Sequence, residues 1–249
     1  MIYWIWLSQI KGIGIQLQRA LIEHFKDPEV IYHASKEQLM AVRNFGSSRA
    51  AKVLNNKSLE GAKKIIRDCK KHGISIMTLK DDIYPTYAKE IYDMPILLYY
   101  KGNPQKNSIG AAVVGSRRCS REGRIKAIEL GFELANKSIP VVSGMAKGID
   151  SYAHTACLKA GGYTVAVLGC GLDICYPREH KLLMQRIEKQ GLLLSEYPPG
   201  TPADANHFPK RNRIIAAWSE TIYIAEAGNK SGALITKEYG LKYGRKIIE

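Results

Sequence analysis

A short segment at residues 207–213 combines side chains that could bind phosphate groups and flat bases together. It contains the aromatic ring of Phe208 and the cations Lys210, Arg211 and Arg213. The apolar run 214–218 follows at once, so the cations are anchored at the mouth of a folded domain rather than carried on a tail. Cations neutralise phosphates, and an aromatic ring stacks on an unpaired base. The segment therefore suits a sugar-phosphate chain whose bases are unpaired.

Not every member of this segment needs to touch a ligand. Phe208 and Arg211 are expected to contact it. Asn212 and Arg213 could do the same, or they could brace the loop from behind. Asparagine and arginine both donate hydrogen bonds, to phosphate oxygens and to main-chain carbonyls alike, so the residue types leave both roles open.

A second candidate site follows the apolar run 109–114. Gly115 lets a ligand approach the main chain, Ser116 offers a hydroxyl, and Arg117 stands near the start of the next expected helix. A helix N-terminus with a guanidinium group is a phosphate-binding arrangement. The spacing is not the Gly-x-Gly-x-x-Gly dinucleotide fingerprint, because the next glycine is Gly123. A tight strand-to-helix turn with solvated arginines is the alternative.

The segment 142–150 carries two glycines and a serine ahead of another expected helix, and Lys147 projects from it. Lys147 is a further candidate for phosphate binding. We expect Asp150 to cap the helix. Asp150 and His154, four residues apart, would also suit acid–base catalysis, but no serine or cysteine nucleophile is evidently paired with them. A structural role is favoured for both.

Two more loops could bind anions. The glycine-rich segment 168–173 is followed by Arg178, a candidate phosphate contact, and its Cys170 is expected to be a small filler rather than a nucleophile. The segment 226–232 combines glycines with a lysine and a serine. Four or five such loops at one edge of a sheet would indicate an extended anionic ligand.

Apolar runs that alternate with helical patterns must position these loops. Each run ends in a glycine-containing or polar loop, and they lie at residues 109–114, 139–142, 163–168, 192–194 and 221–225. Buried strands alternating with helices predict a doubly wound, mostly parallel sheet covered on both faces, an α/β fold. Further strands are expected at 74–79, 96–100 and near 245–249. Ligands of such sheets bind beyond the carboxyl ends of the strands, where the candidate loops fall.

The first 62 residues have a helical rather than a strand-like apolar pattern and are expected to form a small all-α domain. An apolar helix leads to a Gly-x-Gly turn at 12–14, and helix–turn–helix patterns run through 17–25 and 39–54. They resemble the SAM-like or helix-hairpin-helix class. In DNA-binding hairpins the glycine turn offers N–H groups to a phosphate, but a packing domain would look the same. The expected domains are therefore 1–62 and 63–249.

Composition narrows the class of protein. The 249 residues are 45% hydrophobic and 24% charged, as in an ordinary globular protein. No stretch is apolar enough to span a bilayer, and the apolar start lacks the basic region of a signal peptide. Five irregularly spaced cysteines without a Cys-x-x-Cys pair indicate neither a zinc site nor a disulfide framework. A cytoplasmic protein without metal or cofactor is expected. Its net charge of +14 attracts polyanions.

Four motifs together resemble the DprA/Smf family of DNA-processing proteins. They lie at residues 114–117, 143–154, 208–216 and 226–232, and their order and spacing match over roughly residues 110–246. The resemblance implies an extended Rossmann-like domain that binds single-stranded DNA. It also implies a role in loading the RecA recombinase onto incoming strands during natural transformation, often as a homodimer. Members of the family are not known as enzymes.

Carried over residue by residue, the resemblance implicates Gly115, Ser116 and Arg117 in phosphate binding and the Phe208 loop in base contact. It places residues 211–213 at the groove. Lys147 stands where the family commonly has arginine, which keeps the charge. The complete set of expected DNA-binding residues is Gly115, Ser116, Arg117, Lys147, Arg178, Phe208, Lys210, Arg211, Asn212 and Arg213.

Two enzyme classes are the alternatives. Nucleotide-processing hydrolases of the lysine-decarboxylase-like Rossmann group carry a Pro-Gly-Gly-x-Gly-Thr-x-x-Glu loop. The nearest stretch here, 228–238, lacks the Pro-Gly-Gly run and the spacing that would place a catalytic glutamate on a ribose. An NAD-dependent oxidoreductase is disfavoured by the missing dinucleotide fingerprint and the missing acidic residue at the ribose position.

Overall fold

The computed structural model describes residues 1–228 and 231–249, which divide into two compact units. The first unit comprises Met1–Gly73 together with Tyr92–Leu97. The second comprises Ile74–Ile91 and Leu98–Glu249. The domain boundary expected at residue 62 falls inside the helix Glu60–His72, which belongs to the first unit.

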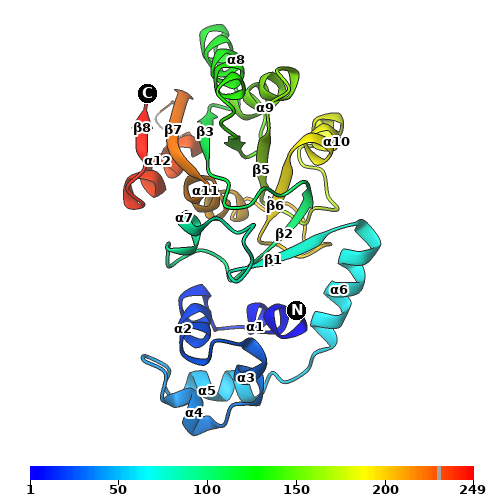
Figure 1. Cartoon of the computed structure of the whole chain (residues 1–249), viewed down its shortest axis with the longest axis vertical. Helices are drawn as coiled ribbons and strands as arrows, with labels where there is room; N and C mark the ends of the chain where they lie inside the picture. Colours follow the sequence, from blue (N-terminus) through cyan, green and yellow to red (C-terminus); the bar gives the residue numbers. More distant parts are fainter. Residues whose placement is uncertain (229–230) are drawn as a thin grey trace. The chain divides into compact units, whose positions relative to one another are not determined.

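The first unit is helical (Figure 1). Its helices are α1 (Ile2–Gln9), α2 (Ile15–Phe25), α3 (Pro28–His33), α4 (Lys36–Met40), α5 (Ser47–Leu54) and α6 (Glu60–His72). Local sequence sets two of their starts. The Asp27 side chain accepts a hydrogen bond from Glu29 N at the start of α3, and Ser35 forms a capping box with Gln38 at the start of α4. Helices thus occupy the segments with helical patterns, and the SAM-like class stays a prediction.

The second unit is built on a sheet of eight strands among the described residues. Their spatial order is β1 (Ser75–Thr78), β2 (Leu97–Gly102), β6 (Leu192–Ser195), β5 (Thr164–Leu168), β4 (Val141–Ser143), β3 (Gly110–Gly115), β7 (Ser219–Glu226) and β8 (Lys246–Ile248). From β6 to β8 all neighbours are parallel, whereas β2 pairs with β6 in the antiparallel sense. The mostly parallel sheet predicted from the apolar runs is confirmed.

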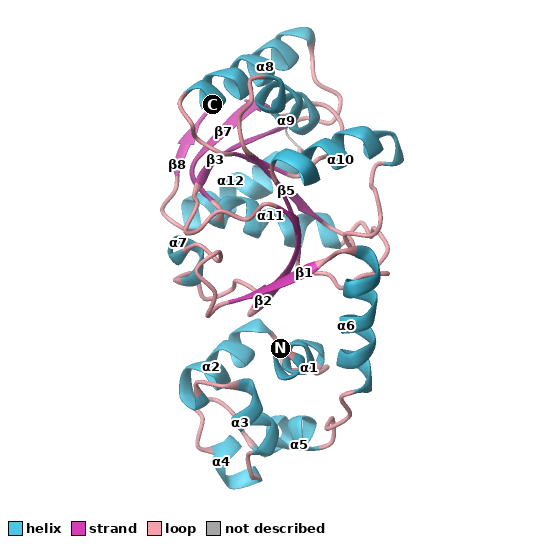
Figure 2. Cartoon of the chain, turned by 45° about the vertical axis from the view of Figure 1, so that its right-hand side comes forward, coloured by secondary structure: helices cyan, strands magenta, loops and turns pink. Residues whose placement is uncertain are grey.

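Helices cover both faces of this sheet (Figures 1 and 2). On one face α8 (Arg121–Asn136), α9 (Ile149–Lys159) and α10 (Lys181–Gln190) pack side by side. On the other face α11 (His207–Ala217) packs against α12 (Gly232–Lys242). The short helix α7 (Thr86–Lys89) and the 3₁₀ helix η1 (Arg178–His180) lie in the connections. The doubly wound α/β fold is therefore confirmed.

The strand β3 shows why the predicted strands read as continuous apolar runs. Ala111 and Val113 pack with Ile149 of α9 in the core of one face. Val114 lies with Ile215 of α11 on the other face. Because both faces are covered by helices, every position from Gly110 to Val114 is buried, and no polar residue alternates with the apolar ones.

Candidate functional site

An open groove of about 750 Å³ lies at the carboxyl edge of the parallel strands. At this point β3 has β4 on one side and the much later strand β7 on the other. Such a reversal of strand order is where doubly wound sheets bind ligands. The groove is lined by the loop after β3 and by the first turns of α11 and α12, with Gly115, Ser116, Arg117, Phe208, Arg211 and Asn212 among the lining residues.

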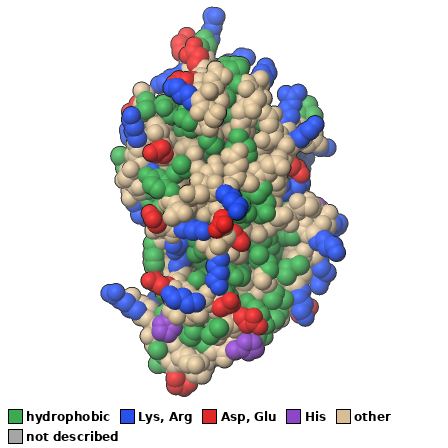
Figure 3. Space-filling model, viewed as in Figure 1, with side chains coloured by type: hydrophobic (Ala, Val, Ile, Leu, Met, Phe, Trp, Pro, Cys, Tyr) green, Lys and Arg blue, Asp and Glu red, His purple; other side chains and the backbone are tan. Residues whose placement is uncertain are grey.

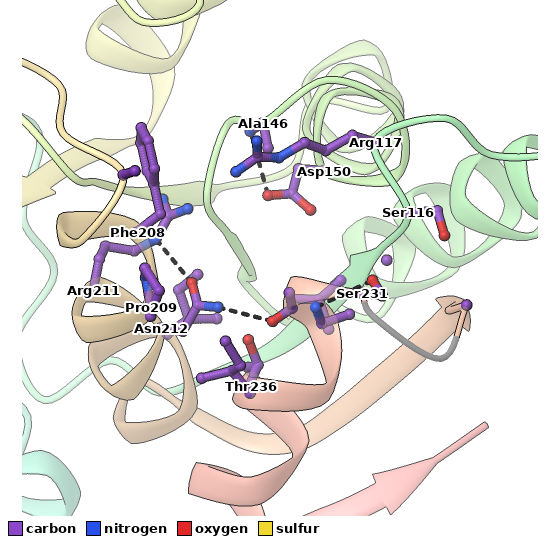
Figure 4. A pocket seen from close by; sticks show the side chains of 18 of the residues that line it. Ser116, Arg117, Ala146, Asp150, Phe208, Pro209, Arg211, Asn212, Ser231 and Thr236 are labelled. Atoms are coloured by element: carbon purple, nitrogen blue, oxygen red, sulfur yellow. Dashed lines mark hydrogen bonds between the residues drawn. The ribbon is translucent and has the colours of Figure 1, made fainter.

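Arg117, Phe208 and Tyr176 form a cationic and aromatic rim on the groove. The guanidinium carbon of Arg117 lies 5.5 Å from the centre of the Phe208 ring, and Figure 4 shows its side chain reaching toward that ring. The Phe208 and Tyr176 rings stack with centroids 5.2 Å apart and planes inclined by 26°. Arg117 and Tyr176 are exposed, and Phe208 is half-buried. The rim therefore brings one charge and two rings to the groove.

The start of α11, which carries Phe208, is fixed by the loop after β5. Nδ1 of His207 lies 3.1 Å from the main-chain oxygen of Gly169. The His207 ring also stacks on Tyr197, with centroids 4.0 Å apart. The position of the Phe208 ring at the rim is therefore set by contacts on the preceding residue.

The other exposed cations differ in how close they come to the groove. Lys147 pairs with Glu179 of η1, and its side chain also lines a hollow of about 60 Å³ beside the rim. Arg178 is exposed at the start of η1, and Lys210 is exposed on α11. Among the described residues, none of these three cations is part of the groove lining, and Lys147 is the one that lines the hollow beside it. Of these three expected contacts, the structure brings Lys147 to the rim.

Arg211 is buried beneath the groove and binds main chain. It is only 5% exposed. Its Nη1 donates to Gly144 O at 2.8 Å and to Val167 O, and its Nε donates to Asn212 Oδ1 at 3.1 Å. A Cβ on Gly144 would lie 2.4 Å from the guanidinium, so glycine is required for this approach. Arg211 thus joins the ends of β4 and β5 to α11 while one side of it faces the groove.

Asn212 and Arg213 complete a buried layer with Arg211. The Nδ2 group of Asn212 donates to Gly232 O at 3.0 Å and so connects α11 to the first residue of α12. Arg213 pairs with Glu196 and donates from Nη1 to Lys210 O at 2.6 Å. Asn212 also lines the groove, whereas Arg213 is directed at Glu196. Arg213 is therefore placed to brace the loop. Asn212 is placed both to brace the loop and to meet a ligand in the groove.

Asp150 does not cap α9 as predicted. Its carboxylate accepts hydrogen bonds from Gly144 N at 3.0 Å and from Ala146 N at 3.3 Å, and no side chain caps α9. The prediction is wrong because the loop before the helix folds back and brings its own N–H groups to the carboxylate (Figure 4). Burial raises the pKa of Asp150, and the nearby Arg211 charge and these N–H groups oppose the rise.

His154 is fully buried and pairs with a threonine rather than with Asp150. Its Nδ1 lies 2.7 Å from Thr164 Oγ1. The Thr164 hydroxyl donates its single proton to Val141 O at 2.7 Å, so it can only accept from the ring, and the neutral histidine carries its proton on Nδ1. Burial, helped by the charge of Arg211, lowers the pKa of His154 to about 3. This geometry agrees with a structural role.

The loops after β3 and β4 are in main-chain contact with each other. Ile149 N donates to Ser116 O at 3.3 Å. Gly148 has φ 75°, and a Cβ there would lie 2.3 Å from Ser116 O. Ser116 N in turn donates to Glu226 O at the end of β7, at 2.8 Å. Gly115 and Ser116 are thereby fixed at the groove.

One aromatic and one cationic residue of the described groove lining, Tyr176 and Arg118, are missing from the set expected from sequence. Tyr176 lies two residues before the predicted contact Arg178, and an aromatic residue beside a glycine-rich loop is the sequence signal that points to it. Arg118 is exposed next to Arg117 and also lines the groove. Asn229 and Lys230 of the 226–232 loop lie outside the described residues.

On the face seen in Figure 3, Lys and Arg side chains are interspersed with Asp and Glu over the surface. In the described part of the chain, no group of three or more His, Cys, Asp or Glu side chains could hold a metal ion. No helix described there is both long and apolar enough to cross a membrane.

The fold and the groove define a Rossmann-like α/β protein with a site suited to an extended anionic ligand that carries flat rings. The chain belongs to the DNA recombination-mediator protein A family, whose sequence model matches residues 75–249. This confirms the resemblance to the DprA/Smf proteins. The DNA processing protein DprA of Streptococcus pneumoniae is 46% identical over a match that covers 69% of this chain and 61% of that protein.

Two solved structures agree with this assignment. The X-ray structure of DNA processing protein A from Streptococcus pneumoniae matches with a TM-score of 0.81 and 34% identity, covering 99% of this chain and 85% of that one. DNA processing protein A from Helicobacter pylori, studied for its single-stranded DNA binding mode, matches with a TM-score of 0.62 and 29% identity. That match covers 70% and 79% of the two chains. The chain spans just over three fifths of the length of three of the curated relatives that it matches.

Proposed function

We propose that this chain binds single-stranded DNA without sequence specificity in the groove of its second unit, and that it acts in DNA processing during recombination and natural transformation. The observation that carries the proposal is the rim, where the Arg117 guanidinium lies 5.5 Å from the Phe208 ring and Tyr176 stacks on that ring. A charge beside π-faces suits a strand with unpaired bases, because every base can stack whatever its identity.

The comparisons support the same ligand and process. The relative from Helicobacter pylori is described by its single-stranded DNA binding mode. The family is named for mediating DNA recombination. From this name and the resemblance we further propose that the bound strand is passed to the RecA recombinase, and that the chain works as a homodimer.

The residues of the groove divide the work of binding. Arg117 and Lys147 neutralise phosphates, and Phe208 and Tyr176 stack on bases. The main chain at Gly115 and the hydroxyl of Ser116 approach the backbone of the strand. Arg178 and Lys210, outside the lining, meet phosphates of a longer strand, while the residues that hold the groove in shape are Arg211, Asn212 and Arg213.

A binding role rather than catalysis is supported by the titratable groups under the groove. The Asp150 carboxylate is engaged by main-chain N–H groups. His154 is neutral and buried. Burial raises the pKa of the Cys170 thiol to about 11, which leaves it protonated and a poor nucleophile near neutral pH. The nucleotide-hydrolase alternative requires that the protein release the base from AMP, and we expect no release.

The test is a fluorescence-anisotropy titration of labelled oligo-dT with the wild-type chain and with the variants Arg117→Ala and Phe208→Leu, at salt concentrations from about 50 to 200 mM. Loss of one stacked base should weaken binding at least about fivefold for Phe208→Leu. Arg117→Ala should weaken binding at low salt and reduce the slope of log K against log salt by about 0.7, the value of one phosphate contact with a single strand.

Matched controls remove the same kind of group, a cation or an aromatic ring, at a position away from the groove. Lys159→Ala removes an exposed cation at the far end of α9, and Phe132→Leu removes a half-exposed ring on α8. Neither should change the affinity measurably. The proposal fails if the groove variants behave like these controls. Release of base from AMP by the wild-type chain would favour the hydrolase instead.

A further inference from the structure

The first unit has a groove of its own, of about 700 Å³, which the proposed function does not use. It is formed by the start of α2, the connection between α4 and α5, and the segment Tyr92–Leu97 that joins this unit from later in the chain. All of its lining residues therefore belong to one compact unit. The residues that give the groove its chemistry are Gln16, Arg43, Asn44, Arg49 and Tyr92.

Cations gather at this groove without carboxylate partners. Arg43 and Arg49 line it and are exposed. Lys52 is one turn after Arg49 on α5, and its Nζ lies over the turn before α2, 2.5 Å from the position of a Cβ on Gly12. Within the described residues, none of these three cations is in an ion pair. Uncompensated like charges repel, and an anion in the groove would relieve that repulsion.

Tyr92 presents an aromatic ring at the same groove. Its hydroxyl donates to Gln16 O at 3.1 Å, which holds the ring against the start of α2. The guanidinium of Arg19 lies 5.9 Å from the ring centre and donates to Met94 O at 3.3 Å. Tyr92 is nevertheless 49% exposed. An exposed ring anchored through its hydroxyl can accept a flat partner without rearranging.

We propose that this groove binds a second stretch of single-stranded nucleic acid, with Arg43 and Arg49 on phosphates and Tyr92 stacked on a base. The chemistry is that of the rim in the second unit, a guanidinium beside a ring, but it is built from different residues on a different unit. The proposal therefore does not rest on the proposed function of the rim. Charge and aromatic surface together favour a strand with unpaired bases over a duplex, whose bases are already stacked.

The test uses the full chain with its rim removed by Arg117→Ala and Phe208→Leu, so that residual binding reports on the first unit. In this background Arg43→Glu with Arg49→Glu should weaken oligo-dT binding at least about tenfold. The slope of log K against log salt should fall by about 1.4, the value of two phosphate contacts with a single strand.

The matched control is Lys26→Glu with Lys36→Glu, which makes the same change of charge in the same unit. Both lysines are exposed, and they lie at the ends of α2 and α4 that are remote from the groove. At about 0.15 M salt distant charges are screened, so this pair should change the affinity less than about threefold. Equal effects of the two pairs would overturn the proposal.

Variants of Tyr92 test whether the groove binds a single strand or a duplex. Tyr92→Leu should weaken binding of oligo-dT about fivefold or more, and Tyr92→Phe should weaken it less, because the ring that stacks is kept and only its anchor to Gln16 O is lost. Neither should alter binding of a hairpin duplex. If Tyr92→Leu has no effect on oligo-dT, or if the arginine pair affects only the duplex, the groove does not bind a single strand. The rim variants in the otherwise wild-type chain test the proposed function separately.

Discussion

The rim and the buried layer beneath it use arginine for opposite purposes. Arg117 ends in solvent beside two rings, where its donors can meet a ligand. Arg211 is buried, and its donors bind Gly144 O, Val167 O and its helical neighbour Asn212. A buried donor or acceptor that loses its partner costs more free energy than an exposed one gains by pairing. Losing the rim should therefore cost ligand affinity, and losing the buried layer should cost the fold.

The largest expected difference between the rim and the buried layer is the difference in stability between the variants Arg117→Ala and Arg211→Ala. Removing Arg211 takes a donor from each of two buried main-chain oxygens and removes the cation near Asp150, so the free energy of unfolding should fall by about 3 kcal/mol or more. Removing Arg117 should change it by less than about 0.5 kcal/mol. Urea unfolding measures both. Similar losses in the two variants would show that burial does not separate the two roles.

The second prediction concerns how the free energy of unfolding depends on pH. The pKa of His154 is 6.5 in the unfolded chain and about 3 in the folded one. Between these values the unfolded state binds a proton that the folded state does not, so stability is complete above pH 6.5 and falls as the pH is lowered, by up to about 1.4 kcal/mol per pH unit. His154→Leu should flatten this dependence, and Thr164 Oγ1 would still donate to Val141 O. Urea unfolding midpoints of the wild-type chain and of the variant, measured at several pH values, test this prediction. An unchanged slope in the variant would exclude His154 as the cause.

The smallest expected effect is a difference in coupling energy between two ion pairs. Arg213 and Glu196 are 8% and 13% exposed in their side chains, whereas Lys147 and Glu179 are 59% and 53% exposed. A double-mutant cycle of Arg213→Met with Glu196→Gln should give a coupling energy of about 1–2 kcal/mol. The cycle of Lys147→Met with Glu179→Gln should give none that is measurable, since solvent screens the pair. A larger coupling for the exposed pair would reverse the comparison.

The sequence predicts the sheet well because its strands are buried on both faces. Runs such as that of β3 are continuously apolar, and the glycine-containing loops after them mark the edge where ligands bind. The start of the second unit is harder to locate. The helix α6 is strongly basic on its exposed side, and no composition change separates it from the helices before it. A boundary at residue 62 consequently divides a helix that is continuous in the structure.

The sequence predicts several of the side chains that line the groove but not their directions. Arg117, Arg211 and Arg213 are equivalent as residue types, and only the location of their partners assigns them to solvent or to the core. The acceptors of Arg211 lie 67 and 44 residues away in sequence. Asp150 fails as a predicted cap for a local reason, because the N–H groups that it binds belong to the loop that precedes its helix. Tyr176 is overlooked because stacking on Phe208 depends on the fold.

The contact between Gly148 and Ser116 O has a consequence for how this protein can change over evolution. The loops after β3 and β4 are joined there by main chain, without room for a Cβ, and the first of them is also hydrogen-bonded to the end of β7. An insertion in either loop would displace both. Side chains at this edge of the sheet can therefore be substituted, and such substitutions can change which ligand it prefers. An insertion that lengthens one of the two loops alone is not tolerated.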